Sequence, residues 1–234
     1  MPTMQKAPRR KRDPQSTRIA ILEAAKTVLA KDGSEGLSVS SVAQLAGVNR
    51  GTAYQHFNAK EELVRATLEW VSQQLLVAVF EDGGLGGEGA SSRPDIDLAH
   101  LPGVINGMAE FNLRLSLYAV ENPEIGRIWL YDVLSRQNPR EDVFYKRFEQ
   151  SMQNFADSDA SEKDIDVQAL AVLMLTGYFL WPVWVESHAK SKKARQKMAE
   201  RYAAEVLRVS MHGVIHADGY AILQSFLEKN LNKS

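Results

Sequence analysis

The segment Gly36–Leu63, GLSVSSVAQLAGVNRGTAYQHFNAKEEL, decides the fold of this 234-residue chain. Ser38 stands at an N-cap position, and the pattern after it predicts a short helix over 38–46 with Val42, Leu45 and Ala46 facing inward. Gly47 is suited to the left-handed conformation that ends a helix. Asn49 then caps a second short helix that runs to Phe57. Two short helices joined by a tight glycine turn predict a helix-turn-helix over 38–57.

The second of these helices has side chains suited to the major groove of DNA, which is about 12 Å wide. Arg50 and Gln55 can make bidentate contacts with bases, and Gly51 allows close approach of the backbone. Tyr54, His56 and Lys60 are suited to phosphates, and Lys60 lies near a helix start that favours anions. The predicted outward set is Asn49, Arg50, Gly51, Thr52, Gln55 and His56, with Tyr54 at its edge.

Helical patterns continue on both sides of this motif. A helix from Ser16 stops at Asp32-Gly33, and a long helix begins with Glu61 and Glu62, whose charges suit the helix dipole. The segment 82–93 holds five glycines and predicts a linker or long loop. No alternating strand pattern appears, so the chain reads as all-α. The later helices are predicted at 99–121, 124–137, 140–156, 162–188, 191–217 and near 220–230.

The charge of the chain is divided unevenly. The formal net charge is −1, yet residues 1–60 carry +6 and the other 174 residues carry −7. A basic end on an acidic body indicates that this end meets a polyanion, either nucleic acid or an anionic membrane surface. Residues 1–15 are basic and rich in proline, and we expect a disordered arm there that either reaches DNA or serves as a solubilising tail. Its basic run is Arg9, Arg10, Lys11 and Arg12.

The segment Gly36–Leu63 resembles the DNA-binding domain of TetR-family transcriptional regulators, and the resemblance extends from about Ser16 to Val71. Its most specific part is Ala43, Ala46-Gly47-Val48, Gly51, Tyr54, His56-Phe57, Lys60 and Leu63 at matching spacings. Beyond it, the chain matches that family only in length and helical pattern. Ser38 stands where the family often has Thr, and Ala53 stands where a larger aliphatic residue is common, which is expected to loosen packing of the recognition helix.

This resemblance implies a homodimer that binds double-stranded DNA at a near-palindromic operator and responds to a small-molecule effector. We also expect no cofactor, a cytoplasmic location and a domain division into an arm (1–15), a DNA-binding domain (16–76) and a helical ligand-binding and dimerisation domain (77–234). The positions where the family reads bases are Ser40, Arg50, Gly51, Thr52, Tyr54 and Gln55. The positions where it grips phosphates are Ser38, Tyr54, His56 and Lys60.

The small effector has a predicted pocket among the aromatic residues of the body. We expect most of these residues to be core and some to line an apolar cavity, with Asn112 and Arg114 as polar selectors. Arg114 could pair with a carboxylate of the effector or equally with Glu110. The chemical character of the effector is therefore open, and we expect it to be apolar or aromatic. The candidate lining is Phe111, Arg114, Tyr118, Trp129, Phe148, Met152 and Tyr178.

Two stripes of residues predict a dimer interface, because small residues let helices approach closely. An intramolecular core is the alternative for the same stripes. The charge-free run Ala169–Val185 needs more partners than one small domain offers, which favours the dimer. The stripes are Ala203, Val206, Ser210, Gly213 and Ala217 on one helix and Met174, Gly177 and Trp181, with Leu170 and Trp184, on the other.

Other kinds of site have weak sequence support. The run Ala169–Val185 is at the lower limit for a membrane span, but Pro182 interrupts it, so a buried helix is the preferred interpretation. His212 and His216 share a helix face but lack a third metal ligand nearby. The chain has no cysteine, and no nucleophile elbow, Walker loop or GxGxxG occurs. An all-α enzyme and a DNA-binding adaptor without a small ligand remain the alternatives to a ligand-responsive repressor.

Overall fold

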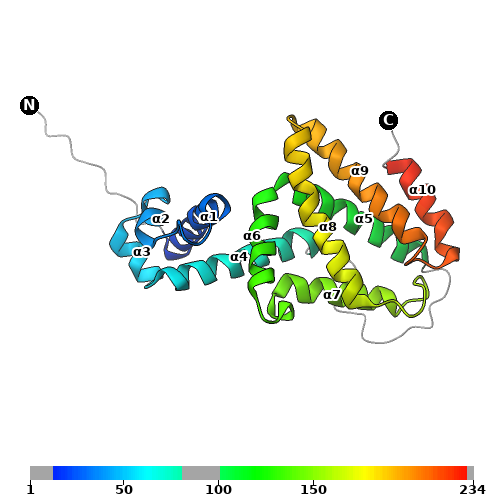
Figure 1. Cartoon of the computed structure of the whole chain (residues 1–234), viewed down its shortest axis with the longest axis horizontal. Coiled ribbons are helices and arrows are strands. Elements are labelled where there is room, and N and C mark those ends of the chain that lie inside the picture. The colour runs from blue at the N-terminus through cyan, green and yellow to red at the C-terminus, as the bar shows by residue number, and fades with distance from the viewer. Residues whose placement is uncertain (1–12, 81–100, 231–234) are drawn as a thin grey trace, which may run out of the picture. The chain divides into compact units, whose positions relative to one another are not determined.

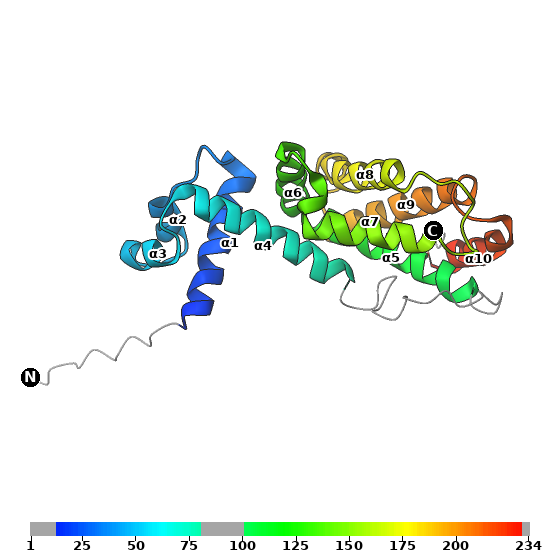
Figure 2. The ribbon, with the colours of Figure 1, turned by 90° about the horizontal axis from the view of Figure 1, so that it is seen from below.

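The computed structural model describes residues 13–80 and 101–230, and the chain divides into two compact units, Met1–Trp70 and Val71–Ser234 (Figures 1 and 2). This division falls inside one helix, α4 (Lys60–Phe80), rather than after residue 76. The predicted arm with Arg9, Arg10, Lys11 and Arg12, and the glycine-rich segment 82–93, lie outside the described residues. Among the described residues all the regular elements are helices, with one isolated bridge between Ser161 and Ile215 and no strand, which confirms the all-α prediction.

The N-terminal unit contains α1 (Pro14–Asp32), α2 (Val39–Leu45), α3 (Arg50–His56) and the first half of α4. α1 begins earlier than predicted, because Asp13 caps it by accepting a hydrogen bond from the Ser16 N–H, and Pro14 is tolerated in a first turn. Pro14 and Gln15 are therefore helical, and their assignment to the arm was wrong. α1 ends at Gly33, whose φ of +68° is readily adopted by glycine.

The core of this unit joins all four helices. α1 contributes Ile21, Leu22 and Ala25, and the fully buried Ala53 and Phe57 come from α3 and its C-cap. The inward placement predicted for Leu45 is wrong, because 57% of this side chain is exposed at the last position of α2. The packing fixes the two short helices against α1, so the helix-turn-helix is part of one hydrophobic core.

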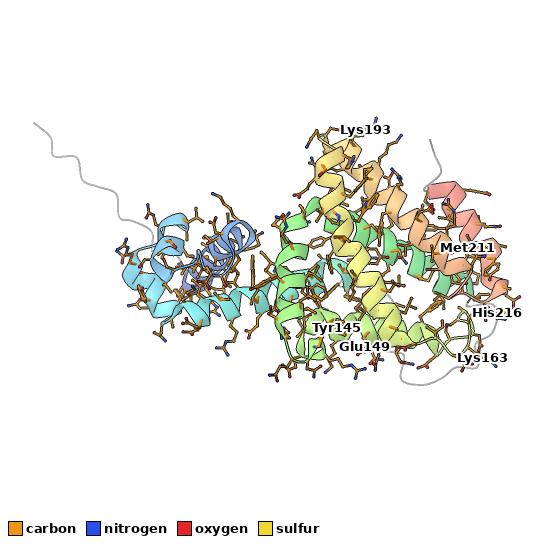
Figure 3. The ribbon with its side chains drawn as sticks, viewed as in Figure 1. Tyr145, Glu149, Lys163, Lys193, Met211 and His216 are labelled. Carbon is orange, nitrogen blue, oxygen red and sulfur yellow. The ribbon has the colours of Figure 1, made fainter. Side chains whose placement is uncertain are left out.

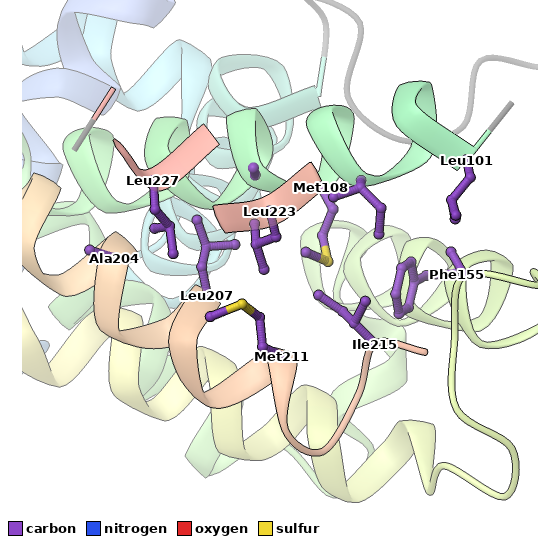
Figure 4. Close-up of a cluster of buried hydrophobic side chains, with 12 residues drawn as sticks. Leu101, Met108, Phe155, Ala204, Leu207, Met211, Ile215, Leu223 and Leu227 are labelled. Atoms are coloured by element: carbon purple, nitrogen blue, oxygen red, sulfur yellow. The ribbon is translucent and has the colours of Figure 1, made fainter. Parts of the chain in front are cut away.

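The C-terminal unit contains the remainder of α4 and the later helices. α5 lies along α9, and their contact is the most extensive between two helices of this unit. Leu207 and Met211 of α9, Met108 of α5 and Leu223 of α10 converge in the cluster of Figure 4. The elements are α5 (Leu101–Glu121), α6 (Pro123–Ser135), η2 (Pro139–Glu141), α7 (Val143–Ala156), α8 (Val167–His188), α9 (Lys192–Met211), η3 (Ala217–Gly219) and α10 (Tyr220–Asn230).

Side-chain caps move two of the predicted helix boundaries, and a third boundary differs at the end of α9. The predicted helix 140–156 is divided because Asp142 caps α7 by accepting from the Tyr145 N–H at 2.8 Å. Asp166 caps α8 in the same way, so α8 begins at Val167 rather than at 162. α9 ends at Met211, labelled in Figure 3, and not at 217. The chain beyond it turns so that the His216 N–H reaches the carbonyl of Ala160 at 2.9 Å.

α8 is apolar on nearly all sides and contains Pro182, which is buried. A proline has no backbone N–H, so the hydrogen bond that residue 182 would donate to the carbonyl of Tyr178 is missing. Among the described helices α8 alone is long and apolar enough to cross a membrane, although seven of its residues are buried against the rest of the unit.

Candidate nucleic-acid interface

α3 is a seven-residue helix that is held at both ends. The Asn49 side chain accepts a hydrogen bond from the Gly51 N–H at 2.8 Å and caps its beginning. The turn before it uses Gly47 at a φ of +63°, and the Val48 N–H donates to the carbonyl of Ala43 at 2.9 Å. The end of α3 is fixed by the buried Phe57. These bonds give a short helix one defined orientation in the unit.

The exposed face of α3 carries most of the predicted base-reading residues. Ala53 is the one buried residue of this helix, so packing uses a single narrow side. Arg50, Gly51, Tyr54 and Gln55 are exposed, and Thr52 is half-buried. The predicted outward set therefore stays on the surface, apart from the partial burial of Thr52 and His56.

Ser40 and Tyr54 come from different helices and meet at the surface. The Ser40 hydroxyl on α2 lies 3.5 Å from the Tyr54 hydroxyl on α3, and either oxygen can be the donor. The contact brings together two positions that are fourteen residues apart in the sequence. It also joins the predicted base-reading and phosphate-contacting sets, since Tyr54 belongs to both.

Ser38 is the N-cap of α2, as the sequence predicted, and it also exchanges hydrogen bonds with Ser41, which the sequence did not indicate. Its hydroxyl accepts from the Ser41 N–H at 3.0 Å and donates to the Ser41 hydroxyl at 2.8 Å, which completes a reciprocal cap on α2. A phosphate oxygen accepts hydrogen bonds, so a phosphate would compete with Ser41 for the one hydroxyl hydrogen of Ser38.

The start of α4 combines a cation with an internal carboxylate. Lys60 is the first residue of α4, and His56 lies half-buried at the end of α3, beside the ring of Phe57. The Glu62 carboxylate accepts from the Asn58 N–H at 2.9 Å. The Glu62 carboxylate therefore satisfies the backbone N–H of Asn58 just before α4, and Lys60 supplies the positive charge at this helix start.

Arg18 is a cation near α3 that the sequence analysis did not single out. Its guanidinium carbon lies 4.5 Å from the centre of the Phe57 ring, a cation–π contact between α1 and the end of α3. Helical periodicity places Arg18 on the half-exposed side of α1, but periodicity alone does not say which neighbouring helix that side approaches.

The described part of this unit is nearly neutral. Residues 13–60 contain five basic and four acidic residues, whereas residues 1–12 contain five basic residues and no acidic one. Five of the ten basic residues behind the charge of +6 therefore belong to the segment before α1. The face of α3 is suited to hydrogen bonding rather than to purely electrostatic attraction.

Comparison with known proteins identifies this unit. Residues 21–67 match the family model described as bacterial regulatory proteins, tetR family. The N-terminal unit is therefore similar to the DNA-binding domain of this family. The regulator TtgR of Pseudomonas putida is 46% identical to this chain over 61 residues, which are 26% of this chain and 29% of TtgR. The similarity in sequence to TtgR thus covers less than a third of either protein.

The similarity in fold to solved tetR-family structures covers most of the chain. A γ-butyrolactone receptor described as ArpA-like has a TM-score of 0.60 at 20% identity, over 92% of this chain and 98% of the receptor. CprB of Streptomyces coelicolor, solved in complex with its operator sequence, has a TM-score of 0.58 at 20% identity, over 94% of this chain and 99% of CprB. These likenesses show the same fold.

The structure brings together only part of the predicted ligand pocket. Phe111, Phe148 and Met152 line an internal cavity of about 30 Å³, and Tyr178 lies next to it through a hydrogen bond from its hydroxyl to Asn112. The other three candidates do not line this cavity. Trp129 is buried and donates to Asp142 at 2.9 Å, Arg114 donates to the carbonyl of Val79, and Tyr118 is half-buried.

The predicted dimer stripes do not form an outward face. Ala203 and Ser210 are buried within the subunit, and Val206 is half-buried. Gly213 and Ala217 lie beyond the end of α9, so these two positions were wrongly placed on that helix.

The predicted stripe on α8 is mostly turned inward, although its last member, Trp184, is 55% exposed. Met174 lines the cavity, and Gly177 is so close to the Tyr202 hydroxyl that a Cβ atom would overlap it. Trp181 stacks on the ring of Tyr202 and donates to the carbonyl of Met198 at 3.1 Å. These residues make the α8–α9 contact inside one subunit.

The exposed apolar residues of α8 occupy a neighbouring row. They form the outward α8 face, defined as Val172, Leu173, Leu180, Val183 and Trp184, each with 50–70% of its side chain exposed. Val209 of α9 is 71% exposed.

No group of three or more metal-binding side chains occurs among residues 13–80 and 101–230.

Proposed function

We propose that this chain is a sequence-specific DNA-binding regulator of transcription that acts as a homodimer, and that it is a repressor released from a near-palindromic operator by a small apolar or aromatic effector. The observation that carries the proposal is the exposed face of α3, where Arg50 and Gln55 stand on a helix fixed at both ends. A fixed helix with exposed hydrogen-bonding side chains suits direct readout in the major groove.

Each residue of this interface has a distinct role in the proposal. Arg50 and Gln55 read base edges, while Gly51 and Thr52 allow close approach of the helix. Tyr54 and Ser40 act together at the edge of the groove, supported by their 3.5 Å contact. Lys60, His56 and Ser38 hold phosphates, which fixes the register of the helix on the duplex. The basic run at 9–12 adds contacts that depend strongly on salt.

A near-palindromic operator requires two copies of α3 about 34–36 Å apart. The outward α8 face supports a second copy of this chain as the partner, because its exposed apolar area is larger than scattered surface residues explain. Two copies that meet through the same face form a closed twofold dimer. A cytoplasmic location is consistent with DNA as the ligand.

An effector in the C-terminal unit would act by favouring one conformation of the dimer. The cavity beside α5, α7 and α8 supports such a site, and the fold of a protein named as a γ-butyrolactone receptor provides a precedent for small-molecule binding on this architecture. An effector that binds better to a conformer with mismatched recognition helices lowers operator affinity by that difference in binding.

The experiment that tests the proposal is selection of bound DNA from random and genomic fragments with the full-length protein. We expect enrichment of a near-palindromic sequence, and loss of that enrichment for R50A and Q55A. The matched control is K31A, which removes one exposed positive charge from α1 instead of α3. Absence of any enriched sequence would refute the proposal, as would equal losses for R50A and K31A.

A further inference from the structure

We infer that the internal cavity of the C-terminal unit is the contracted form of a binding site for an uncharged molecule with an apolar body and one hydrogen-bonding oxygen, such as an alcohol or a ketone. This inference rests on the proposed function, since it names the class of the effector. It is argued from the lining of the cavity, from its buried hydrogen bonds and from its size.

The lining of the cavity contains no charged side chain. Three methionines and three phenylalanines supply most of its surface, and Asn112, Ser151 and Ser210 supply its polar groups. A carboxylate or ammonium group in such a place would be buried without a charged partner, which costs several kcal/mol in proteins. The lining therefore selects against ionised ligands.

One polar group of the lining, the Asn112 amide, takes part in two buried hydrogen bonds. The Nδ2 atom of Asn112 donates to the carbonyl of Met108 at 2.9 Å, and its Oδ1 atom accepts from the Tyr178 hydroxyl. Asn112 is 2% exposed and Tyr178 is 1% exposed. An amide has two N–H donors and two acceptor sites, so this buried pair can still accept or donate one more hydrogen bond.

A second buried hydroxyl lies one helical turn further along α5. Ser116 is 2% exposed, and its Oγ atom has no hydrogen-bond partner within the described structure. A buried hydroxyl without a partner costs free energy unless another group satisfies it. Asn112 and Ser116 therefore place unused hydrogen-bonding capacity on the same side of α5, and of the two Asn112 lines the cavity, where a ligand oxygen can use it.

The cavity has to expand before it holds a ligand. Its volume of about 30 Å³ is close to that of one water molecule, whereas small-molecule sites measure about 300–1,000 Å³. Met108, Met152 and Met174 come from α5, α7 and α8, and their side chains each have three rotatable bonds. Movement of these three side chains opens the site on three helices at once.

The test compares three eight-carbon probes that differ only in their polar group: 1-octanol, octanoate and octylamine. Titration calorimetry with the full-length protein should show saturable binding of 1-octanol, with octanoate and octylamine at least about 100-fold weaker because of the buried charge. The inference is overturned if octanoate or octylamine binds as tightly as 1-octanol, or if 1-octanol does not bind.

Two substitutions locate the binding in the cavity. M152W fills the space and should abolish binding of 1-octanol, whereas L134W, which adds the same side chain on the exposed surface of α6, should leave it unchanged. M152A enlarges the cavity and should tighten binding of 1-octanol, which keeps the test decisive if M152W does not fold. Binding that is unchanged in M152A and in a folded M152W overturns the inference.

Operator binding distinguishes this inference from the function on which it rests. If 1-octanol binds as expected but never changes the affinity for the selected DNA, the ligand-responsive part of the proposed function fails and the site remains. If the protein selects an operator while the three probes bind equally or not at all, the inference fails and the DNA-binding function remains.

Discussion

Two helices of this protein present opposite kinds of surface. α3 has seven residues with one buried alanine, and the rest of its side chains are polar or small. α8 has 22 residues, and both its buried and its exposed sides are apolar. The same chain therefore carries two kinds of surface. The surface of α3 is suited to hydrogen bonds with a polar partner, and the surface of α8 is suited to burial against an apolar partner.

Substitutions in α3 and in the outward α8 face should act first on different properties of the protein. Substitutions on α3 are expected to change DNA affinity while the oligomeric state stays the same. Substitutions on the outward α8 face are expected to change the oligomeric state first and DNA affinity as a consequence. A substitution that changes both properties directly would show that the two units depend on each other more closely than this comparison implies.

The largest effect is expected for L180E. A buried glutamate at the centre of the outward α8 face would be unpaired in a dimer, which should yield monomers at micromolar concentration and operator affinity lower by at least about 100-fold. Sedimentation velocity and fluorescence anisotropy measure the two quantities. L134E, on the exposed surface of α6, should remain dimeric. A dimeric L180E protein would disprove the assignment of this face.

R50A should cost about 1–3 kcal/mol of operator binding and relax specificity at one base pair. The reason is the loss of a bidentate contact with one base, while the fold keeps its Asn49 cap. Binding to an operator series with each base pair varied measures the effect. A uniform loss across all sequences would instead identify Arg50 as a phosphate contact.

Ser38 can be tested for two roles separately. S38A should lower the free energy of unfolding by about 1 kcal/mol, because the cap on α2 is lost. S38D should keep the cap and still weaken DNA binding, since aspartate is acceptor-only and repels phosphate. Urea unfolding and anisotropy provide the measurements. An S38D protein that binds DNA like the wild type would leave Ser38 with the capping role alone.

K60A should reduce the slope of log affinity against log salt concentration by about one unit, with little change in sequence preference. The loss of one phosphate contact at the start of α4 is the physical reason. The measurement is operator affinity over a range of salt concentrations. Affinity equal to that of the wild type at every salt concentration would contradict the phosphate role of Lys60.

The last prediction concerns how folding stability depends on pH, which Y178F should alter in alkali. Burial raises the pKa of Tyr178 well above its ordinary value of 10.0. The unfolded chain therefore loses this proton first, and folding stability falls as the pH rises above about 10. Y178F should reduce that fall by up to about 1.4 kcal/mol per pH unit, measured by urea unfolding. An unchanged slope in Y178F would contradict the prediction.

The sequence predicted the N-terminal unit better than the C-terminal one for a physical reason. In α3 the buried Ala53 and the polar outward residues differ in chemistry, so periodicity tells the two sides apart. In α8 both sides are apolar, so the inward Met174, Gly177 and Trp181 could not be distinguished from exposed residues such as Leu180 and Val183. Periodicity identified the helix but not its orientation.

Local capping explains the remaining differences in helix boundaries. Asp142 and Asp166 each accept a backbone hydrogen bond that starts a helix, whereas the predicted ranges 140–156 and 162–188 placed both residues inside helices. The end of α9 depends on a distant contact, since the His216 N–H reaches the carbonyl of Ala160. Contacts between residues far apart in sequence are outside what a single helical pattern can indicate.

Pro182 makes α8 easier to bend at one point along its length. The missing backbone hydrogen bond to the carbonyl of Tyr178 weakens the helix between the turn that contacts Asn112 and the turn that carries Val183 and Trp184. When one end of α8 is displaced, the helix can change its bend at Pro182 instead of rotating as one rigid body. Amide hydrogen exchange along α8 should accordingly be fastest near Pro182.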